Sequence, residues 1–183
     1  MSRGLARDIV QLARANAQAD PSLRDVADAF LLDGFAVLAM TRLRVMARRL
    51  HIPAANRILR LAQMALYGID IGNDVQLGSG VYFVHPVGTV LGGDCEVGER
   101  VRFLGSNTVG TAREDGYPVI EEDVVVGCGA RILGPIRVGR GAVIGANAVV
   151  VHDVPPGALV LGVPGVLRRS SGATYATQKG AHS

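Results

Sequence analysis

The segments IDIGNDVQLGSGVYF (residues 69–83) and IEEDVVVGCGARILGPIRVGRGAVIGANAVV (residues 120–150) place large apolar residues at every sixth position. Neither an amphipathic helix, with a period of 3.6, nor a half-buried strand, with a period of two, has this spacing. Most of these residues follow a second apolar or small residue by two positions, and we expect both sets to point into one core. The large apolar positions are Ile71, Leu77, Phe83, Leu91, Val97, Phe103, Val109, Ile120, Val126, Ile132, Val138, Ile144 and Val150.

Glycine follows many of these large apolar residues, as at Gly72, Gly78, Gly127 and Gly145. Because glycine adopts positive φ without steric cost, we expect it to form the turn after each short strand. A fixed six-residue period with such turns predicts a β-solenoid in which stacked hexads bury one continuous core. An ordinary sandwich of short strands is the alternative, but it would show alternation of period two and irregular turn spacing.

The composition gives no sign of nucleic-acid binding or of a membrane-spanning segment. The formal net charge of the 183 residues is only +3. The one dense basic run is Arg42, Arg44, Arg48 and Arg49, which we interpret as a solvated helix face, with contact to a membrane surface as the lesser alternative. No apolar run is long enough for a membrane span. Arg7 and Asp8 stand where a signal peptide would have its apolar core, so we expect a cytoplasmic protein.

The residues before the repeat have helical periodicity and few helix breakers. We expect a helical segment over residues 1–67, with one helix ending at Asp20-Pro21, a second capped by Ser22 and a third from Ala54 to Tyr67. It should pack on the end of the solenoid, which would otherwise expose apolar surface. The repeat fills residues 68–168, and residues 169–183 form a small polar tail expected to be disordered.

His85 stands in Val84-His85-Pro86, where the hexads lose their glycines, so its side chain leaves the core pattern. Asp70 precedes it by fifteen residues, which brings the two onto neighbouring parts of adjacent coils of about eighteen residues. A carboxylate that holds one imidazole nitrogen raises the basicity of the other. The spacing is therefore consistent with a general base, although a lone histidine is more often structural.

Several motifs resemble the serine acetyltransferase branch of the hexapeptide-repeat acyltransferases. They are Gly68-Ile69-Asp70-Ile71 with His85 at its distance, Gly127-Cys128-Gly129-Ala130, Ile144-Gly145-Ala146, Val154-Pro155-Pro156 and Gly162-Val163-Pro164. The resemblance covers most of residues 20–168. It implies a mainly β fold, a left-handed parallel β-helix of three hexads per coil with an N-terminal helical segment. It also implies transfer of an acetyl group from acetyl-CoA to an acceptor hydroxyl.

The same resemblance assigns roles to particular residues. His85 and Asp70 match the general-base pair. Gly110, Thr111, Cys128 and Ala146 fall on positions of the family's CoA groove, which runs between two subunits of a trimer, and Arg168 could reach a CoA phosphate. We therefore expect a homotrimer. No metal is expected, because the coils offer only His85 and His152 where a histidine zinc site needs three ligands.

The acceptor site departs from the family's pattern. Val84 replaces the aspartate before the catalytic histidine, and Gly116-Tyr117 replaces an Arg-His pair in a shortened loop, so that only Asp20 keeps a charged role. An ammonium and a carboxylate need opposite charges in their site. We therefore expect free serine to be a poor acceptor and Val84 with Tyr117 to form an apolar wall for an uncharged hydroxyl, such as that of a sugar or a glycan precursor. The alternatives are a serine O-acetyltransferase and a non-enzymatic β-helical scaffold.

Overall fold

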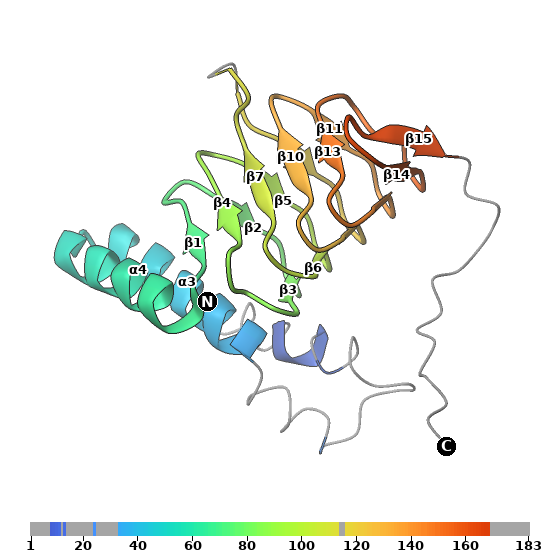
Figure 1. Cartoon of the computed structure of the whole chain (residues 1–183). Helices are drawn as coiled ribbons and strands as arrows, with labels where there is room; N and C mark the ends of the chain where they lie inside the picture. Colours follow the sequence, from blue (N-terminus) through green and yellow to red (C-terminus); the bar gives the residue numbers. More distant parts are fainter. Residues whose placement is uncertain (1–7, 12, 14–23, 25–32, 114–115, 169–183) are drawn as a thin grey trace.

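The computed structural model describes residues 8–11, 13, 24, 33–113 and 116–168 (Figure 1). Two long helices, α3 (Asp33–Arg49) and α4 (Pro53–Tyr67), precede a series of short strands. The strands are β1 (Asp70–Ile71), β2 (Gln76–Leu77), β3 (Tyr82–Phe83), β4 (Val90–Leu91), β5 (Glu96–Val97), β6 (Arg102–Phe103), β7 (Thr108–Gly110), β8 (Val119–Ile120), β9 (Val125–Val126), β10 (Arg131–Leu133), β11 (Arg137–Val138), β12 (Val143–Ile144), β13 (Val149–Val150), β14 (Leu159–Leu161) and β15 (Val166–Arg168).

Every third strand pairs in parallel with the strand one coil away, which gives three sheets around one axis (Figure 1). The sheets have the orders β1-β4-β7-β10-β13, β11-β8-β5-β2 and β15-β14-β12-β9-β6-β3, and only β15 runs antiparallel to its neighbour. We call them sheets A, B and C. The coil lengthens where Asp70 pairs with Val90 and again where Thr108 pairs with Arg131. The predicted parallel β-helix is confirmed.

The core lies inside the coils and contains the residues that the six-residue period selects. All the large apolar positions are buried except Leu77, which is partly buried, and the set two positions earlier is buried as well. Phe83 and Phe103 stack on adjacent coils with ring centroids 5.3 Å apart. This stacking extends the apolar column without a gap, as offset aromatic pairs do in protein interiors.

The glycines after the large apolar residues do not supply positive φ, so that expectation is wrong. Gly78 and Gly127 are absent from the residues with positive φ, a conformation found instead at other corner residues such as Gly80 and Asp123. Gly78 and Gly127 are needed because the next coil passes too close for a side chain. A Cβ on Gly78 would lie 2.5 Å from the carbonyl carbon of Gly98, and one on Gly127 would lie 2.5 Å from the nitrogen of Ala146.

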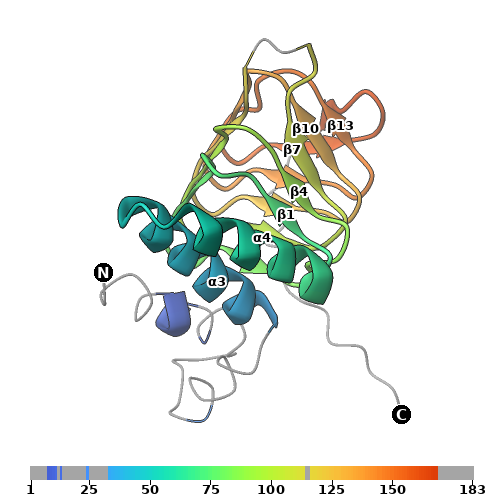
Figure 2. The same cartoon turned by 90° about the vertical axis from the view of Figure 1, so that its left-hand side faces the viewer.

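Helices α3 and α4 cover the first coil (Figure 2). α4 begins at Pro53, whose missing N–H costs nothing in the first turn, and ends at Gly68, a left-handed cap whose N–H binds the Met64 carbonyl. α3 lies so close to β3 that a Cβ on Gly34 would be 2.8 Å from the Phe83 carbonyl oxygen. The predicted packing of helices on the solenoid end is therefore observed, whereas Ser22 and the tail 169–183 lie outside the described residues.

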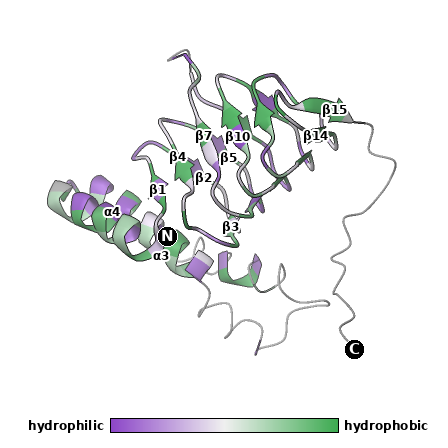
Figure 3. Ribbon diagram, in the orientation of Figure 1, coloured by the Kyte–Doolittle hydropathy of each residue, from purple (hydrophilic) through white to green (hydrophobic). Residues whose placement is uncertain are grey.

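The basic run of α3 is only partly solvated, which corrects its interpretation as an exposed face. Arg44 is 3% exposed and binds the Gln63 side chain, the Ile71 carbonyl and Asn73. Arg42 binds the carbonyls of Leu77 and Gly78 and the buried carboxylate of Asp8. Polar and apolar residues mix along both helices (Figure 3), and none of the described helices is long and apolar enough to cross a membrane.

Candidate active site

Asp70 begins β1 and points away from the core, because its neighbour Ile71 takes the buried position. Both of its carboxylate oxygens accept hydrogen bonds from Arg60 of α4. Arg60 Nε lies 2.8 Å from Oδ1, and Arg60 Nη2 lies 2.9 Å from Oδ2. The two side chains are 37% and 28% exposed, so the pair stands at the surface within reach of a ligand. Sequence reasoning singled out Asp70 but not Arg60.

His85 lies on the corner between β3 in sheet C and β4 in sheet A, with its side chain exposed. This corner is tied to the start of β1, because Gly88 N–H donates to the Gly68 carbonyl and Asp70 N–H donates to that of Thr89. The fold thus brings the His85 corner beside Asp70. No hydrogen bond joins the two side chains in the described structure, and the general-base pair stays a prediction.

Gly105 of the next coil packs against the backbone of His85, and Asn107 holds Gly105 in place. A Cβ on Gly105 would lie 2.9 Å from the His85 carbonyl oxygen, so a larger residue there would displace the corner. Buried Asn107 accepts a hydrogen bond from Gly105 N–H and donates one of 2.6 Å to the Gly127 carbonyl. Sequence reasoning missed both residues. The signal was present, because Asn107 and Thr89 are polar residues in the inward set that precedes the large apolar positions by two.

Positive charge exceeds negative charge around Asp70. The hydrogen bond with Asp70 raises the pKa of the Arg60 guanidinium above its ordinary value. Arg44 also lies within electrostatic range of Asp70, and its pKa is lowered mainly by burial and then by the nearby charge of Arg60. Both arginines titrate far above neutral pH and stay charged there. One carboxylate thus faces two cations, which favours a further anionic group at this place.

The residues expected in the CoA groove form two groups on the single chain. Gly110 ends β7 and Thr111 follows it; a Cβ on Gly110 would meet open space, and the buried Thr111 Oγ1 has no hydrogen-bond partner in the described structure. Cys128 and Ala146 lie exposed on adjacent coils at the opposite edge of sheet A, joined through the hydrogen bond from Asn147 N–H to the Cys128 carbonyl. Cys128 is a free, exposed thiol.

The remaining predicted residues are spread over the chain. Val84 is partly buried next to His85, but Tyr117 lies across sheet A on the glycines that follow β4, where a Cβ on Gly93 would be 2.0 Å from its ring. One chain therefore does not bring Val84 and Tyr117 into a common wall. Asp20 lies outside the described residues, and Arg168 is described only through its backbone in β15.

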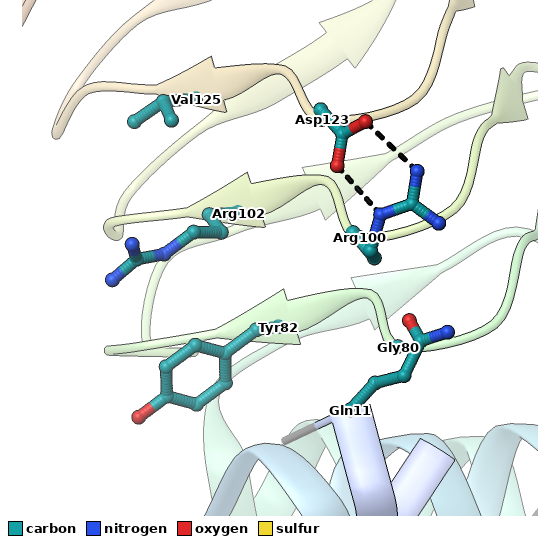
Figure 4. Close-up of a pocket in the computed structure, with 7 residues that line it drawn as sticks. All are labelled: Gln11, Gly80, Tyr82, Arg100, Arg102, Asp123 and Val125. Atoms are coloured by element: carbon teal, nitrogen blue, oxygen red, sulfur yellow. Dashed lines mark hydrogen bonds and ion pairs between the residues drawn. The ribbon is translucent and has the colours of Figure 1, made fainter. Parts of the chain in front are cut away.

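A hollow of about 380 Å³ lies on the outer side of sheet C, away from these residues (Figure 4). Tyr82, Arg102 and Val125 stand on successive coils in it, and Arg100 binds Asp123 through two hydrogen bonds at its edge. None of the predicted site residues lines this hollow. Over the ranges that the structure describes, no three histidine, cysteine or acidic side chains gather to hold a metal ion.

Comparison with known proteins identifies the family of this chain. The model described as bacterial transferase hexapeptide (six repeats) matches residues 117–152. The serine acetyltransferase of Buchnera aphidicola from Acyrthosiphon pisum is 32% identical over 183 residues, which covers 97% of this chain and 67% of that relative. The chain therefore belongs to the hexapeptide-repeat acyltransferases and, within them, to the serine acetyltransferase branch.

Other relatives agree but are longer. The serine acetyltransferase of Bacillus licheniformis is 43% identical over 110 residues, and the chain spans 51% of its length. The serine acetyltransferase of Neisseria gonorrhoeae, solved in complex with serine, matches with a TM-score of 0.79 and 29% identity over 90% of this chain and 68% of that one. That of Brucella abortus, solved with coenzyme A, matches with a TM-score of 0.83 and 28% identity over 94% and 69%.

The prediction of an acceptor other than free serine is wrong. Relatives that are up to 43% identical bear the name serine acetyltransferase, and a structure that resembles this one was solved with serine. The prediction rested on the missing charges beside His85 and in the loop, where Val84, Gly116 and Tyr117 provide none, and it left Asp20 as the remaining charged group. Arg60 was not counted, because α4 was expected only to cap the solenoid.

Proposed function

We propose that this chain is a serine O-acetyltransferase that uses acetyl-CoA. The observation that carries the proposal is the likeness to serine acetyltransferases solved with serine and with coenzyme A, at TM-scores of 0.79 and 0.83. The exposed histidine on a rigid corner is the chemical feature that supports it, because acyl transfer to a hydroxyl needs a base that removes the hydroxyl proton.

In the proposed reaction His85 takes the proton from the serine hydroxyl as the oxygen attacks the thioester carbon of acetyl-CoA. The carbon–sulfur bond of the tetrahedral intermediate then breaks, and the leaving CoA thiolate takes the proton from the imidazolium. The products are O-acetylserine and free CoA, so protons and electrons balance. The Ser106 N–H donates to the Val87 carbonyl, and Gly105 packs against the backbone of His85, so the next coil limits the positions from which His85 can act.

Asp70 is the proposed partner of the imidazolium. Each of its carboxylate oxygens accepts one hydrogen bond from Arg60 and has a second lone pair left. Because His85 is exposed, its side chain can turn toward β1 without displacing core atoms. A carboxylate at that position would stabilise the imidazolium formed during the reaction.

Acetyl-CoA is the proposed acyl donor, and a homotrimer is the proposed assembly. The unpartnered Thr111 Oγ1 can bind an amide of the pantetheine arm, which carries such groups along its length. Thr111 and the pair Cys128 and Ala146 stand at opposite edges of sheet A, so a groove that uses all three needs a neighbouring subunit. The side chain of Arg168 is proposed to bind a CoA phosphate. The proposed location is the cytoplasm, where acetyl-CoA is made.

An acceptor panel tests this proposal. Release of free thiol from acetyl-CoA would be measured with L-serine, homoserine, ethanolamine and several monosaccharides at equal concentrations. We expect L-serine to give the highest kcat/KM. Turnover with a monosaccharide but not with L-serine would contradict the proposed function.

A further inference from the structure

We propose that Arg60 binds the carboxylate of the amino-acid acceptor and is therefore a specificity-determining residue. The inference rests on the proposed function, because it presumes that the acceptor is serine. A site that prefers serine to an analogue without the carboxylate needs a cation close to the His85 corner. Arg60 is the described cation that has both the location and the free donors for this role.

The hydrogen bonds of Arg60 leave one edge of its guanidinium open. A guanidinium has five N–H donors in a planar fork. Asp70 occupies the edge formed by Nε and Nη2, so the two N–H groups of Nη1 and the second of Nη2 have no partner in the described structure. The edge formed by Nη1 and Nη2 can therefore accept a second carboxylate in the bidentate arrangement that arginine favours.

The environment of Arg60 selects for an anion. The Arg60 side chain is 37% exposed, so a ligand can reach it, yet Asp70 holds the guanidinium in one orientation and reduces the entropy lost on binding. Arg44 adds a second positive charge within electrostatic range. The Asp70 carboxylate neutralises only one of the two, and a carboxylate from the acceptor would balance the other.

Other described arginines near sheet A fit less well. Arg131 stands on β10, three strands from β1 and about 14 Å away at the usual strand spacing, and its Nη1 already binds the Ser106 carbonyl. Arg113 belongs to the exposed loop after β7, at the edge of sheet A away from the His85 corner. Arg48 binds Asp74 and the Asn73 backbone instead.

A comparison of L-serine with L-serinamide tests the role of Arg60. Both acceptors present the same hydroxyl and an amino group, but only serine has a carboxylate. The measured quantity is the ratio of kcat/KM for serine to that for serinamide, in the wild type and in Arg60→Met, with Arg57→Met as the control. Arg57 is an exposed arginine one turn earlier on α4 and has no ion pair in the described structure.

We expect Arg60→Met to lower the serine-to-serinamide ratio on the order of 10- to 100-fold, as loss of a charge-assisted bidentate pair does. Serinamide turnover should change much less, Arg57→Met should keep the wild-type ratio, and Arg60→Lys should retain part of the preference because it keeps the charge without the fork. If Arg60→Met fails to fold, the same ratio in Arg60→Gln decides.

Equal losses for serine and serinamide in a folded variant would overturn the inference, because Arg60 would then act only by holding Asp70. Unchanged kcat/KM values for both acceptors would overturn it as well. In both cases the wild type still acetylates serine, so the proposed function survives. A wild type that acetylates neither compound refutes the proposed function and the role of Arg60 together.

Discussion

His85 combines an exposed side chain with a backbone that cannot move freely. Its carbonyl oxygen and Cβ lie against Gly105, and the adjoining turn is hydrogen-bonded to Gly68 at the start of the first coil. Replacement of the side chain therefore removes a functional group without opening a cavity in the core. A substitution at His85 can therefore change the activity without changing the free energy of unfolding.

We predict that His85→Ala lowers kcat for acetyl transfer by roughly 10²- to 10⁴-fold, the usual contribution of a general base. The KM for acetyl-CoA should change little, since the imidazole is assigned to the hydroxyl proton. Steady-state kinetics and a thermal unfolding curve measure the two effects. A variant with near-normal turnover would rule out His85 as the base.

At the scale of the hexad, glycine is required where two coils approach each other. Gly78 and Gly110 occupy equivalent places after a large apolar residue, but their surroundings differ. A Cβ on Gly78 would lie 2.5 Å from the backbone of the next coil, whereas a Cβ on Gly110 would have no neighbour within 4 Å. The coil is longer after Gly110, because Thr108 pairs with Arg131, whereas Arg131 pairs with Val149.

This difference predicts unequal effects of alanine. Gly78→Ala should reduce the free energy of unfolding by about 1–3 kcal/mol, because the backbone of two coils must separate to admit the methyl group. Gly110→Ala should stay within about 0.5 kcal/mol of the wild type, and so provides the matched control. Chemical denaturation of both variants measures the two values. Equal losses would show that backbone entropy, rather than coil contact, explains the glycines.

The elements differ in how well the sequence predicts them. The six-residue period identified the core residues correctly, because each hexad repeats the same environment and the inward positions do not depend on distant segments. The role of Arg44 could not be predicted in this way. A helical pattern shows which residues share a face, but the burial of Arg44 depends on how α3 and α4 dock on the first coil. The glycines after the large apolar residues are structurally required, as expected, but the reason is close contact between coils rather than positive φ.

The same distinction applies to the candidate site. Asp70 and His85 could be proposed from spacing and from resemblance to a family, since both lie within the repeat region. Arg60 could not, because a helix outside the repeat supplies it and only the folded chain brings it to Asp70. The prediction about serine was made without this charge. Asn107 could have been noticed, because it is a polar residue in an inward position. A search for apolar residues alone overlooks it.

For the molecule as a whole, we predict a trimer in solution. The single chain leaves the proposed CoA residues at two edges of sheet A, and three copies around a common axis would place one edge of each beside the other edge of its neighbour. Light scattering combined with size-exclusion chromatography should give three times the chain mass of 19.1 kDa. An active monomer would contradict the shared groove, since half of each site would then be missing.

The proposed reaction moves an acetyl group from CoA to the hydroxyl of free serine. The most direct measurement follows the carbon itself, with acetyl-CoA labelled with ¹³C at the carbonyl and L-serine as the acceptor, observed by NMR. We predict that an ester carbonyl signal appears, coupled to the serine β-protons, at the rate at which free thiol is released, and that it is absent with His85→Ala. Thiol release without a labelled serine ester, or the label on a different acceptor only, would contradict the proposed reaction.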